Sequence, residues 1–296
     1  MENFELGQSV IDLLKEGASY LEKCGVSEAR AEADFILAHI LNKTRDKLYL
    51  DRERLLTPAI VEQFWCLVRQ RGARVPLAYI LKTREFMGLN FYVDPNVLIP
   101  RPETELLVEK ALMLIQTDFP GQTVRILDLC TGSGAIAVSL AVHCRSAAIV
   151  ATDISEQALA VARYNAQQHK VWVDFRQGNL FAPVQGQKFD LILSNPPYVS
   201  KDEYLRCSPE VKKEPALALL GGEDGLDFYR YLAMESDEYL TPAGMIIVEI
   251  GNLQGLKVVE LFSQQGYKTE IFPDYAGWDR IVLARKEYDF DIMRPS

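Results

Sequence analysis

Apolar residues recur with two different periods along this chain, and the change of period divides it into two parts. In the first part they return every three or four positions, as on one face of a helix, for example at Ala33, Ile36, Leu37, Ile40 and Leu41. Thr57-Pro58 opens another such stretch, with a capping residue followed by proline in the first helical turn. We therefore predict a small helical domain over residues 1–75.

From about residue 121, short apolar runs alternate with helical patterns. This alternation is typical of a parallel β-sheet whose strands are joined by helices, which makes the chain an α/β protein. The sheet domain is expected over residues 101–296. The expected strands are 124–129, 147–152, 171–176, 189–193, 244–250, 267–272 and 280–284, and the expected helices are 105–115, 135–142, 155–168, 226–239 and 253–265.

Residues 76–100 are expected to form a connector between the two domains. Apolar residues on both sides of Gly88-Leu89-Asn90 predict a short hairpin. After the hairpin, Pro100 and Pro102 keep the chain extended, and Thr104 can cap the next helix. This charged turn between two prolines can form a pocket wall, or it can be an ordinary turn.

Composition and charge narrow the possible partners. The 296 residues suggest about two domains, and the net charge of −9 argues against a wide grip on duplex nucleic acid. The five cysteines are scattered and the three histidines form no ligand cluster, so we expect reduced thiols and no metal site. No signal peptide and no membrane-spanning apolar run is evident. We expect a cytoplasmic monomer that binds neither membranes nor, in a stable way, nucleic acid.

A glycine-containing turn predicts a site for a nucleoside. The segment Asp128-Leu129-Cys130-Thr131-Gly132-Ser133-Gly134 follows an expected strand and opens a helix, and its glycines let the backbone approach a ligand closely. Asp153 stands at the end of the next expected strand, where a carboxylate can accept hydrogen bonds from both ribose hydroxyls. The alternative is a tight strand–helix turn with no ligand.

Two kinds of cofactor fit this turn. Gly132, Gly134 and Ala137 match a relaxed dinucleotide pattern, but the chain offers no obvious site for hydride transfer. S-adenosylmethionine fits better, because its cationic amino group suits Asp128. Its adenine can then lie near Gly178-Asn179-Leu180-Phe181.

A second turn, Ser194-Asn195-Pro196-Pro197-Tyr198, follows the apolar run 189–193. The two prolines end the strand, because neither can donate a hydrogen bond to the sheet. The Asn195 side-chain oxygen and the Pro196 carbonyl can both accept from one planar NH2 group. We therefore predict that this turn binds an amide or an exocyclic amine, with Tyr198 packed against the flat group that carries it. The alternative is an ordinary Asn-Pro turn.

Four segments together resemble the peptide-chain release factor glutamine N5-methyltransferases of the HemK type. They occur in that family's order behind a helical domain, and they are Phe86-Met87-Gly88-Leu89, Leu98-Ile99-Pro100-Arg101-Pro102-Glu103-Thr104-Glu105, Asp128-Leu129-Cys130-Thr131-Gly132-Ser133-Gly134 and Ser194-Asn195-Pro196-Pro197-Tyr198. The resemblance implies a class I S-adenosylmethionine-dependent methyltransferase, with a Rossmann-like, mostly parallel seven-stranded sheet and a reversed last strand. It also implies methyl transfer to the side-chain nitrogen N5 of the glutamine in a release factor's Gly-Gly-Gln loop.

The resemblance assigns roles to individual residues and makes the helical domain the part that recognises the substrate. The implied catalytic residues are Asn195, Pro196 and Tyr198. The implied cofactor-binding residues are Asp128, Cys130, Thr131, Gly132, Ser133, Gly134, Asp153, Asn179, Leu180 and Asn195. The implied substrate-binding residues are Asn195, Pro196, Pro197 and Tyr198.

Two positions depart from the family's pattern. Many members have glycine where this chain has Cys130, and a cysteine is tolerable there if its φ is negative. Asn179 replaces a frequent aspartate and would accept a hydrogen bond from adenine more weakly than a charged group. Both departures bear on cofactor affinity rather than on the reaction.

Three other functions share part of this pattern. An adenine-N6 or cytosine-N4 nucleic-acid methyltransferase would use the same Asn-Pro-Pro-Tyr turn on a flipped base, but it needs a basic groove, which the acidic balance disfavours. A ribosomal-protein glutamine methyltransferase differs only in its acceptor. A nucleotide-binding module without catalysis would not need an intact Asn195–Tyr198 turn.

Overall fold

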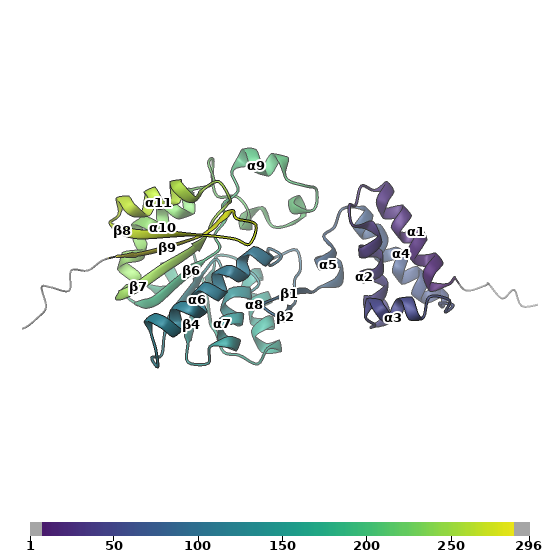
Figure 1. Ribbon diagram of the computed structural model, residues 1–296, viewed down its shortest axis with the longest axis horizontal. Coiled ribbons are helices and arrows are strands. Elements are labelled where there is room, and N and C mark those ends of the chain that lie inside the picture. The colour runs from purple at the N-terminus through teal and green to yellow at the C-terminus, as the bar shows by residue number, and fades with distance from the viewer. Residues whose placement is uncertain (1–7, 287–296) are drawn as a thin grey trace, which may run out of the picture. The chain divides into compact units, whose positions relative to one another are not determined.

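The computed structural model describes residues 8–286. The chain forms two compact units (Figure 1). Within the described residues, one unit contains residues 8–82 together with Ser208–Lys213, and the other contains Thr83–Cys207 together with residues 214–286. The helical unit thus extends past residue 75, where the sequence placed its end, and includes a short segment from much later in the chain.

The helical unit is built from five helices: α1 (Val10–Lys23), α2 (Ala29–Leu41), α3 (Arg45–Leu50), α4 (Pro58–Gly72) and α5 (Leu77–Leu81). Its core contains the periodic apolar residues of α1, α2 and α4, including the fully buried Leu13, Ile36 and Phe64. Thr57 precedes α4 as expected, although its side chain makes no capping hydrogen bond.

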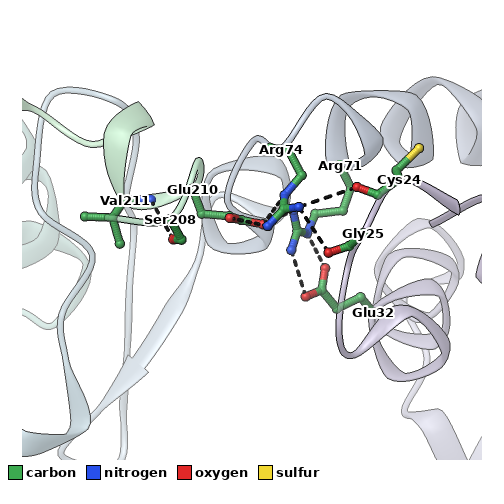
Figure 2. Close-up of polar contacts among 8 residues, drawn as sticks. All are labelled: Cys24, Gly25, Glu32, Arg71, Arg74, Ser208, Glu210 and Val211. Carbon is green, nitrogen blue, oxygen red and sulfur yellow. Dashed lines mark hydrogen bonds and ion pairs between the residues drawn. The ribbon is translucent and has the colours of Figure 1, made fainter. Parts of the chain in front are cut away.

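The segment Ser208–Lys213 is held in this unit by charge. The guanidinium of Arg74 donates from Nε and Nη2 to the two carboxylate oxygens of Glu210, over 2.6 and 2.7 Å (Figure 2). Arg71 donates from Nη1 to the same carboxylate over 2.9 Å, and it also pairs with Glu32 of α2. Arg71 in the last turn of α4 and Arg74 just after this helix thus bind one glutamate that lies far away in the sequence.

The other unit begins with a hairpin and continues into a seven-stranded sheet. The hairpin strands are β1 (Arg84–Phe86) and β2 (Leu89–Phe91), and the turn between them is Met87-Gly88, with φ of 52° and 71°. This turn lies one to two residues earlier than expected. The sheet strands are β3 (Arg125–Leu129), β4 (Ala148–Asp153), β5 (Asp174–Gln177), β6 (Phe189–Ser194), β7 (Leu240–Glu249), β8 (Tyr267–Pro273) and β9 (Asp279–Lys286).

The strand order is β5-β4-β3-β6-β7-β9-β8, with all pairs parallel except those that β9 makes. The last strand, β9, therefore runs against the others, and the expected methyltransferase sheet is confirmed. Neighbouring side chains along each strand point to opposite faces, so Ile126 and Leu127 belong to different cores.

Helices cover both faces of the sheet. One core packs against α6 (Glu105–Asp118), α7 (Ala135–His143) and α8 (Glu156–Gln168), and the other against α10 (Asp227–Glu235) and α11 (Gly255–Gln264). A further helix, α9 (Lys201–Arg206), and several short 3-10 turns, among them Pro102–Thr104, were not expected. Within residues 8–286, no helix combines the length and the apolar character needed to cross a lipid bilayer.

Candidate active site

A pocket opens where the carboxyl ends of β3, β4 and β6 meet. It encloses about 820 Å³ of empty space, part of it open to solvent. In an open α/β sheet, ligands bind at this edge, where the strand order reverses. Of the residues expected at the site, the pocket is lined by Cys130, Gly132, Asp153, Asn179, Leu180, Asn195 and Pro197, and the rest of its wall includes Asn96, Val97, Leu98, Pro215, Leu217, Ala218 and Phe228.

The turn after β3 is built on three residues with positive φ. Gly132 and Gly134 have φ of 55° and 79°, and Cys130 has φ of 60°. The expectation that Cys130 would have a negative φ is therefore wrong. A left-handed conformation costs a non-glycine residue roughly 1–2 kcal/mol. Burial raises the pKa of the Cys130 thiol, so the thiol stays protonated.

The two glycines of this turn have different surroundings. A Cβ added to Gly132 would meet no atom within 4 Å, so a side chain there would occupy open space in the pocket. A Cβ added to Gly134 would lie 3.0 Å from the Cβ of Ala162 in α8. Gly132 thus keeps room for a ligand, and Gly134 lets the turn pack against the next helix.

Asp128 lies fully buried in β3, just before this turn. Thr131 donates from Oγ1 to the Asp128 Oδ2 atom over 2.6 Å, and the Oδ1 atom has no hydrogen-bond partner. Burial raises the pKa of Asp128 to about 7, against the hydrogen bond from Thr131. An unpaired buried oxygen costs about 1–3 kcal/mol, so a cationic donor that reached Oδ1 would recover this energy.

Asp153 connects the end of β4 to the turn. Its Oδ2 atom accepts from the Gly132 backbone N–H over 2.9 Å, and its Oδ1 atom accepts from the Ser155 N–H over 2.9 Å. Burial raises the pKa of this carboxyl, and the backbone hydrogen bonds oppose the shift. Each carboxylate oxygen can accept more than one hydrogen bond, so both remain able to receive ribose hydroxyls.

The pocket wall after β5 contains a second strained residue. Leu180 has φ of 47°, and its carbonyl accepts from the Thr152 hydroxyl over 3.3 Å. Beside it, a Cβ on Gly178 would come within 2.4 Å of the Pro183 ring, and Asn179 is exposed at the pocket edge. Strained backbone of this kind is concentrated at ligand sites.

The Asn-Pro-Pro-Tyr turn is held by hydrogen bonds at both ends. Asn195 donates from Nδ2 to the Thr104 Oγ1 atom over 3.1 Å. The Tyr198 carbonyl accepts from the Gln254 side chain over 3.0 Å, and the Tyr198 hydroxyl lies 3.4 Å from the Glu249 carboxylate. A Cβ on Gly221 would come within 2.5 Å of the Pro197 carbonyl, so the chain packs tightly behind the turn.

The structure places the remaining expected residues next to the pocket wall rather than on it. They are Asp128, Thr131, Ser133, Gly134, Pro196 and Tyr198. Two residues near the site were missed as functional candidates. Thr104 was expected to cap α6, but its hydroxyl bonds to Glu249 instead. Glu249 is a charged residue in the apolar run 244–250, and that signal was available in the sequence.

Within residues 8–286, no group of three or more His, Cys, Asp or Glu side chains could hold a metal ion. Asp153 and Asn195, which line the pocket, provide a carboxylate and an amide acceptor, and the unpartnered Oδ1 atom of Asp128 lies buried in β3 just before the turn.

Comparison with known proteins identifies the family. The family model described as "PrmC N-terminal domain" matches residues 12–81, and the one described as "Methyltransferase small domain" matches residues 104–208. A release factor glutamine methyltransferase of Geobacter sulfurreducens is 42% identical, over 90% of this chain and 93% of its own length. The chain belongs to the release factor glutamine methyltransferase family.

Other relatives agree with this placement. A release factor glutamine methyltransferase of Moorella thermoacetica is 42% identical over 92% of this chain and 96% of its own length. The crystal structure of a methyltransferase from Pyrococcus furiosus has a similar fold, with a TM-score of 0.50 and 21% identity over 67% of this chain and 88% of that one. The family resemblance indicated by the four sequence segments is thus confirmed.

Proposed function

We propose that this protein transfers a methyl group from S-adenosylmethionine to the side-chain amide nitrogen of the glutamine in the Gly-Gly-Gln loop of peptide-chain release factors. The observation that carries the proposal is the Asn195 side chain at the pocket, held through its Nδ2 atom by Thr104. This leaves the Asn195 Oδ1 atom as an acceptor for a substrate NH2 group. The names of the relatives at 42% identity support a release factor as the substrate.

The pocket residues suit S-adenosylmethionine. The unpartnered Oδ1 atom of buried Asp128 suits its cationic amino group, and the open space beside Gly132 leaves room for its methionine part. The Asp153 carboxylate suits its ribose, and Asn179 and Leu180 border the adenine end. Cys130, Thr131, Ser133 and Gly134 complete the turn around it.

The reaction on an amide nitrogen depends mainly on positioning. S-adenosylmethionine supplies an electrophilic methyl group bound to a sulfonium sulfur. Asn195 Oδ1 and the Pro196 carbonyl each accept one hydrogen of the glutamine NH2 group, which orients its nitrogen toward that methyl group. The nitrogen–carbon bond forms as the carbon–sulfur bond breaks. The nitrogen then loses one proton to solvent, and Pro197 and Tyr198 shape the space around the amide.

The same proposal covers partners and location. Release factors are the protein partners, the helical domain contributes to their recognition, and the enzyme works as a cytoplasmic monomer without stable nucleic-acid binding. The net charge of −9 supports a protein rather than a nucleic-acid substrate.

One labelling experiment tests the function. The protein is incubated with methyl-labelled S-adenosylmethionine and, separately, with a release factor, with its Gln→Ala variant in the Gly-Gly-Gln loop, and with DNA. We expect label in the first acceptor alone. Label in the Gln→Ala variant would place the reaction at another residue, and label in DNA alone would favour an exocyclic amine as the substrate.

A further inference from the structure

A chain of hydrogen bonds leads from Asn195 into the interior of the sheet unit. The Asn195 Nδ2 atom lies 3.1 Å from Thr104 Oγ1, which lies 2.5 Å from Glu249 Oε2. The other carboxylate oxygen, Oε1, lies 3.4 Å from the Tyr198 hydroxyl. Thr104 is 4% exposed and Glu249 is 1% exposed. One buried carboxylate thus holds both ends of the Asn-Pro-Pro-Tyr turn, indirectly at Asn195 and directly at Tyr198.

When Glu249 is ionised, the number of protons in this chain of hydrogen bonds fixes the direction of each one. A threonine hydroxyl has one proton, and an ionised carboxylate can only accept. The Thr104 proton therefore goes to Glu249, and the Thr104 oxygen must accept its other hydrogen bond. The Asn195 side chain can satisfy that oxygen only with its NH2 group. Its Oδ1 atom is then the end that remains for a substrate.

We propose that Glu249, acting through Thr104, fixes the orientation of the Asn195 amide so that it offers an acceptor to the substrate NH2 group. The inference rests on the function proposed above and deepens it. Thr104 and Glu249 are positioning residues, because they act through Asn195. Without them the Asn195 amide can turn by half a rotation, and its own NH2 group would then face the NH2 group of the substrate.

The surroundings of Glu249 make this arrangement sensitive to pH. Burial raises the pKa of Glu249 to about 7, while the hydrogen bonds from Thr104 and Tyr198 and the charge of Arg280 oppose the shift. A protonated Glu249 can donate its proton to the Thr104 oxygen. The Thr104 hydroxyl can then donate to the Asn195 side chain, so that both hydrogen bonds run in the opposite direction. The titratable groups that face Glu249 from other elements are Arg280 of β9, Glu103 and Tyr198, with the hydroxyl of Tyr229 on its backbone carbonyl.

Substitutions at Thr104 give the first test. Thr104→Val removes the hydroxyl with little change of shape, and it should lower kcat for methyl transfer to a release factor about 10- to 100-fold. The affinity for S-adenosylmethionine, measured by calorimetry, should change less than about twofold, since Thr104 does not line the cofactor end. Thr104→Ser keeps the hydroxyl and should restore most of the loss. Thr117→Val, at the exposed far end of α6, is the matched control and should leave kcat unchanged.

Glu249 gives the second test through the pH profile. Wild-type kcat should fall as pH falls below about 7, because the Glu249 carboxyl, with its raised pKa of about 7, then becomes protonated. Glu249→Gln has nearly the same shape but cannot ionise, so kcat should be low throughout and this step in the profile should be absent. If Thr104→Val fails to fold, the Glu249→Gln profile decides the question.

A double mutant separates positioning from general packing. If Thr104 acts through Asn195, Thr104→Val should add little to the loss already caused by Asn195→Ala. Fully additive losses, a kcat of Thr104→Val within about twofold of wild type, or a loss in Thr104→Ser equal to that in Thr104→Val would each overturn the inference.

The orientation of the Asn195 side chain can also be measured without any methyl transfer, by NMR. The side-chain NH2 signal of Asn195 can be assigned in a nitrogen-15 NMR spectrum by its absence in Asn195→Ala. It should shift in Thr104→Val and in Glu249→Gln. If wild-type protein methylates no acceptor, the proposed function fails, whereas an unchanged NH2 signal in both variants overturns the orientation of Asn195.

Discussion

Single residues at this site are under backbone and electrostatic strain, and Cys130 is the clearest case. It has a positive φ in a turn where a Cβ is unfavourable. We compare Cys130→Gly with Cys130→Ala, since both remove the thiol and they differ only in the Cβ. Relief of about 1–2 kcal/mol of strain exceeds the roughly 0.5–1 kcal/mol entropic cost of glycine, so the glycine variant should be more stable by about 0.5–1 kcal/mol. Urea unfolding measures this, and a more stable alanine variant would contradict it.

Asp128 should make stability depend on pH. Its pKa is raised to about 7 from an ordinary value of 3.8. Between these values the folded state binds a proton that the unfolded state has released, so stability falls as pH rises through this range. Asp128→Asn should remove this contribution. The stability of wild type relative to Asp128→Asn, followed by urea unfolding, should therefore decrease by about 1–3 kcal/mol from pH 4 to pH 8.

The Asp128→Asn substitution should also change the affinity of the protein for the cofactor. At pH 8 the ionised Asp128 should favour the amino group of S-adenosylmethionine, so Asp128→Asn should bind it more weakly in calorimetry. An affinity equal to that of wild type would mean that Oδ1 does not meet the cofactor. If the difference in unfolding free energy between wild type and Asp128→Asn stayed the same from pH 4 to pH 8, Asp128 would not titrate in this range.

At the scale of elements, periodic patterns were sufficient for most strands and helices. The short apolar runs in β3, β4, β6 and β7 alternate along the chain with helical patterns, so they could be predicted as strands. Short pieces such as α9 and the 3-10 turn Pro102–Thr104 lack that periodicity. The start of α9 is set locally, by a capping box between Ser200 and Glu203.

The candidate site likewise contains residues that the sequence pattern located and contacts that only the folded chain creates. Asn195, Gly132 and Asp153 lie at strand ends, where a pattern in the sequence locates them. The hydrogen bond between Thr104 and Glu249 joins residues 145 positions apart, and only the pairing of their elements brings them together. The positive φ of Cys130 likewise follows from the turn geometry and not from the residue type.

Packing between elements predicts a role for Gly221. The Val199 N–H donates to the Leu219 carbonyl over 2.8 Å, and the Gly221 N–H donates to the Val199 carbonyl over 2.9 Å. A Cβ on Gly221 would come within 2.5 Å of the Pro197 carbonyl, which is backbone and cannot swing aside. Gly221→Ala should therefore displace the Asn-Pro-Pro-Tyr turn and lower kcat by about 10-fold or more.

Gly266 provides a control for replacing a glycine by alanine where the added Cβ meets no other atom. Gly266 has φ of 80°, and no atom lies within 4 Å of an added Cβ. Gly266→Ala should cost about 1–2 kcal/mol of stability through backbone strain, with kcat unchanged. Methyl transfer and urea unfolding measured on both variants separate the two effects. Equal turnover in Gly221→Ala and wild type would show that the turn tolerates a shift at Pro197.

At the scale of the whole molecule, the chain passes from the sheet unit into the helical unit and back again after the Asn-Pro-Pro-Tyr turn. Ser208–Lys213 belongs to the helical unit, although the residues on both sides of it belong to the sheet unit. Within this segment, the Glu210 carboxylate is bound by Arg71 and Arg74 of the helical unit. Glu214 directly follows this segment and belongs to the sheet unit, where its carboxylate accepts from the Ile99 backbone N–H over 3.0 Å and pairs with Arg101 over 2.5 Å. The loop that follows the Asn-Pro-Pro-Tyr turn is thus fixed by one glutamate in each unit.

Glu210 should hold residues 208–213 in the helical unit over a defined pH range. Burial acts to raise the pKa of Glu210, but the hydrogen bonds from Arg74 and Arg71 outweigh it and lower the pKa to about 2 (Figure 2). The folded state therefore holds the charge more strongly than the unfolded state. Its contribution is fully present above an ordinary pKa of 4.5 and is lost as pH falls from there toward about 2.

Glu210→Gln keeps the shape of the side chain and removes its charge, leaving Arg71 and Arg74 close together. We expect a loss of about 1–3 kcal/mol at pH 7, because the pair is largely shielded from water. The loss should shrink as pH is lowered toward 3, and proteolysis within residues 201–215 should become faster than in wild type. Glu223→Gln, which breaks an exposed pair with Lys201 in the same loop, should leave both measurements unchanged. Equal proteolysis of Glu210→Gln and wild type would mean that backbone packing, rather than the two arginines, holds the segment.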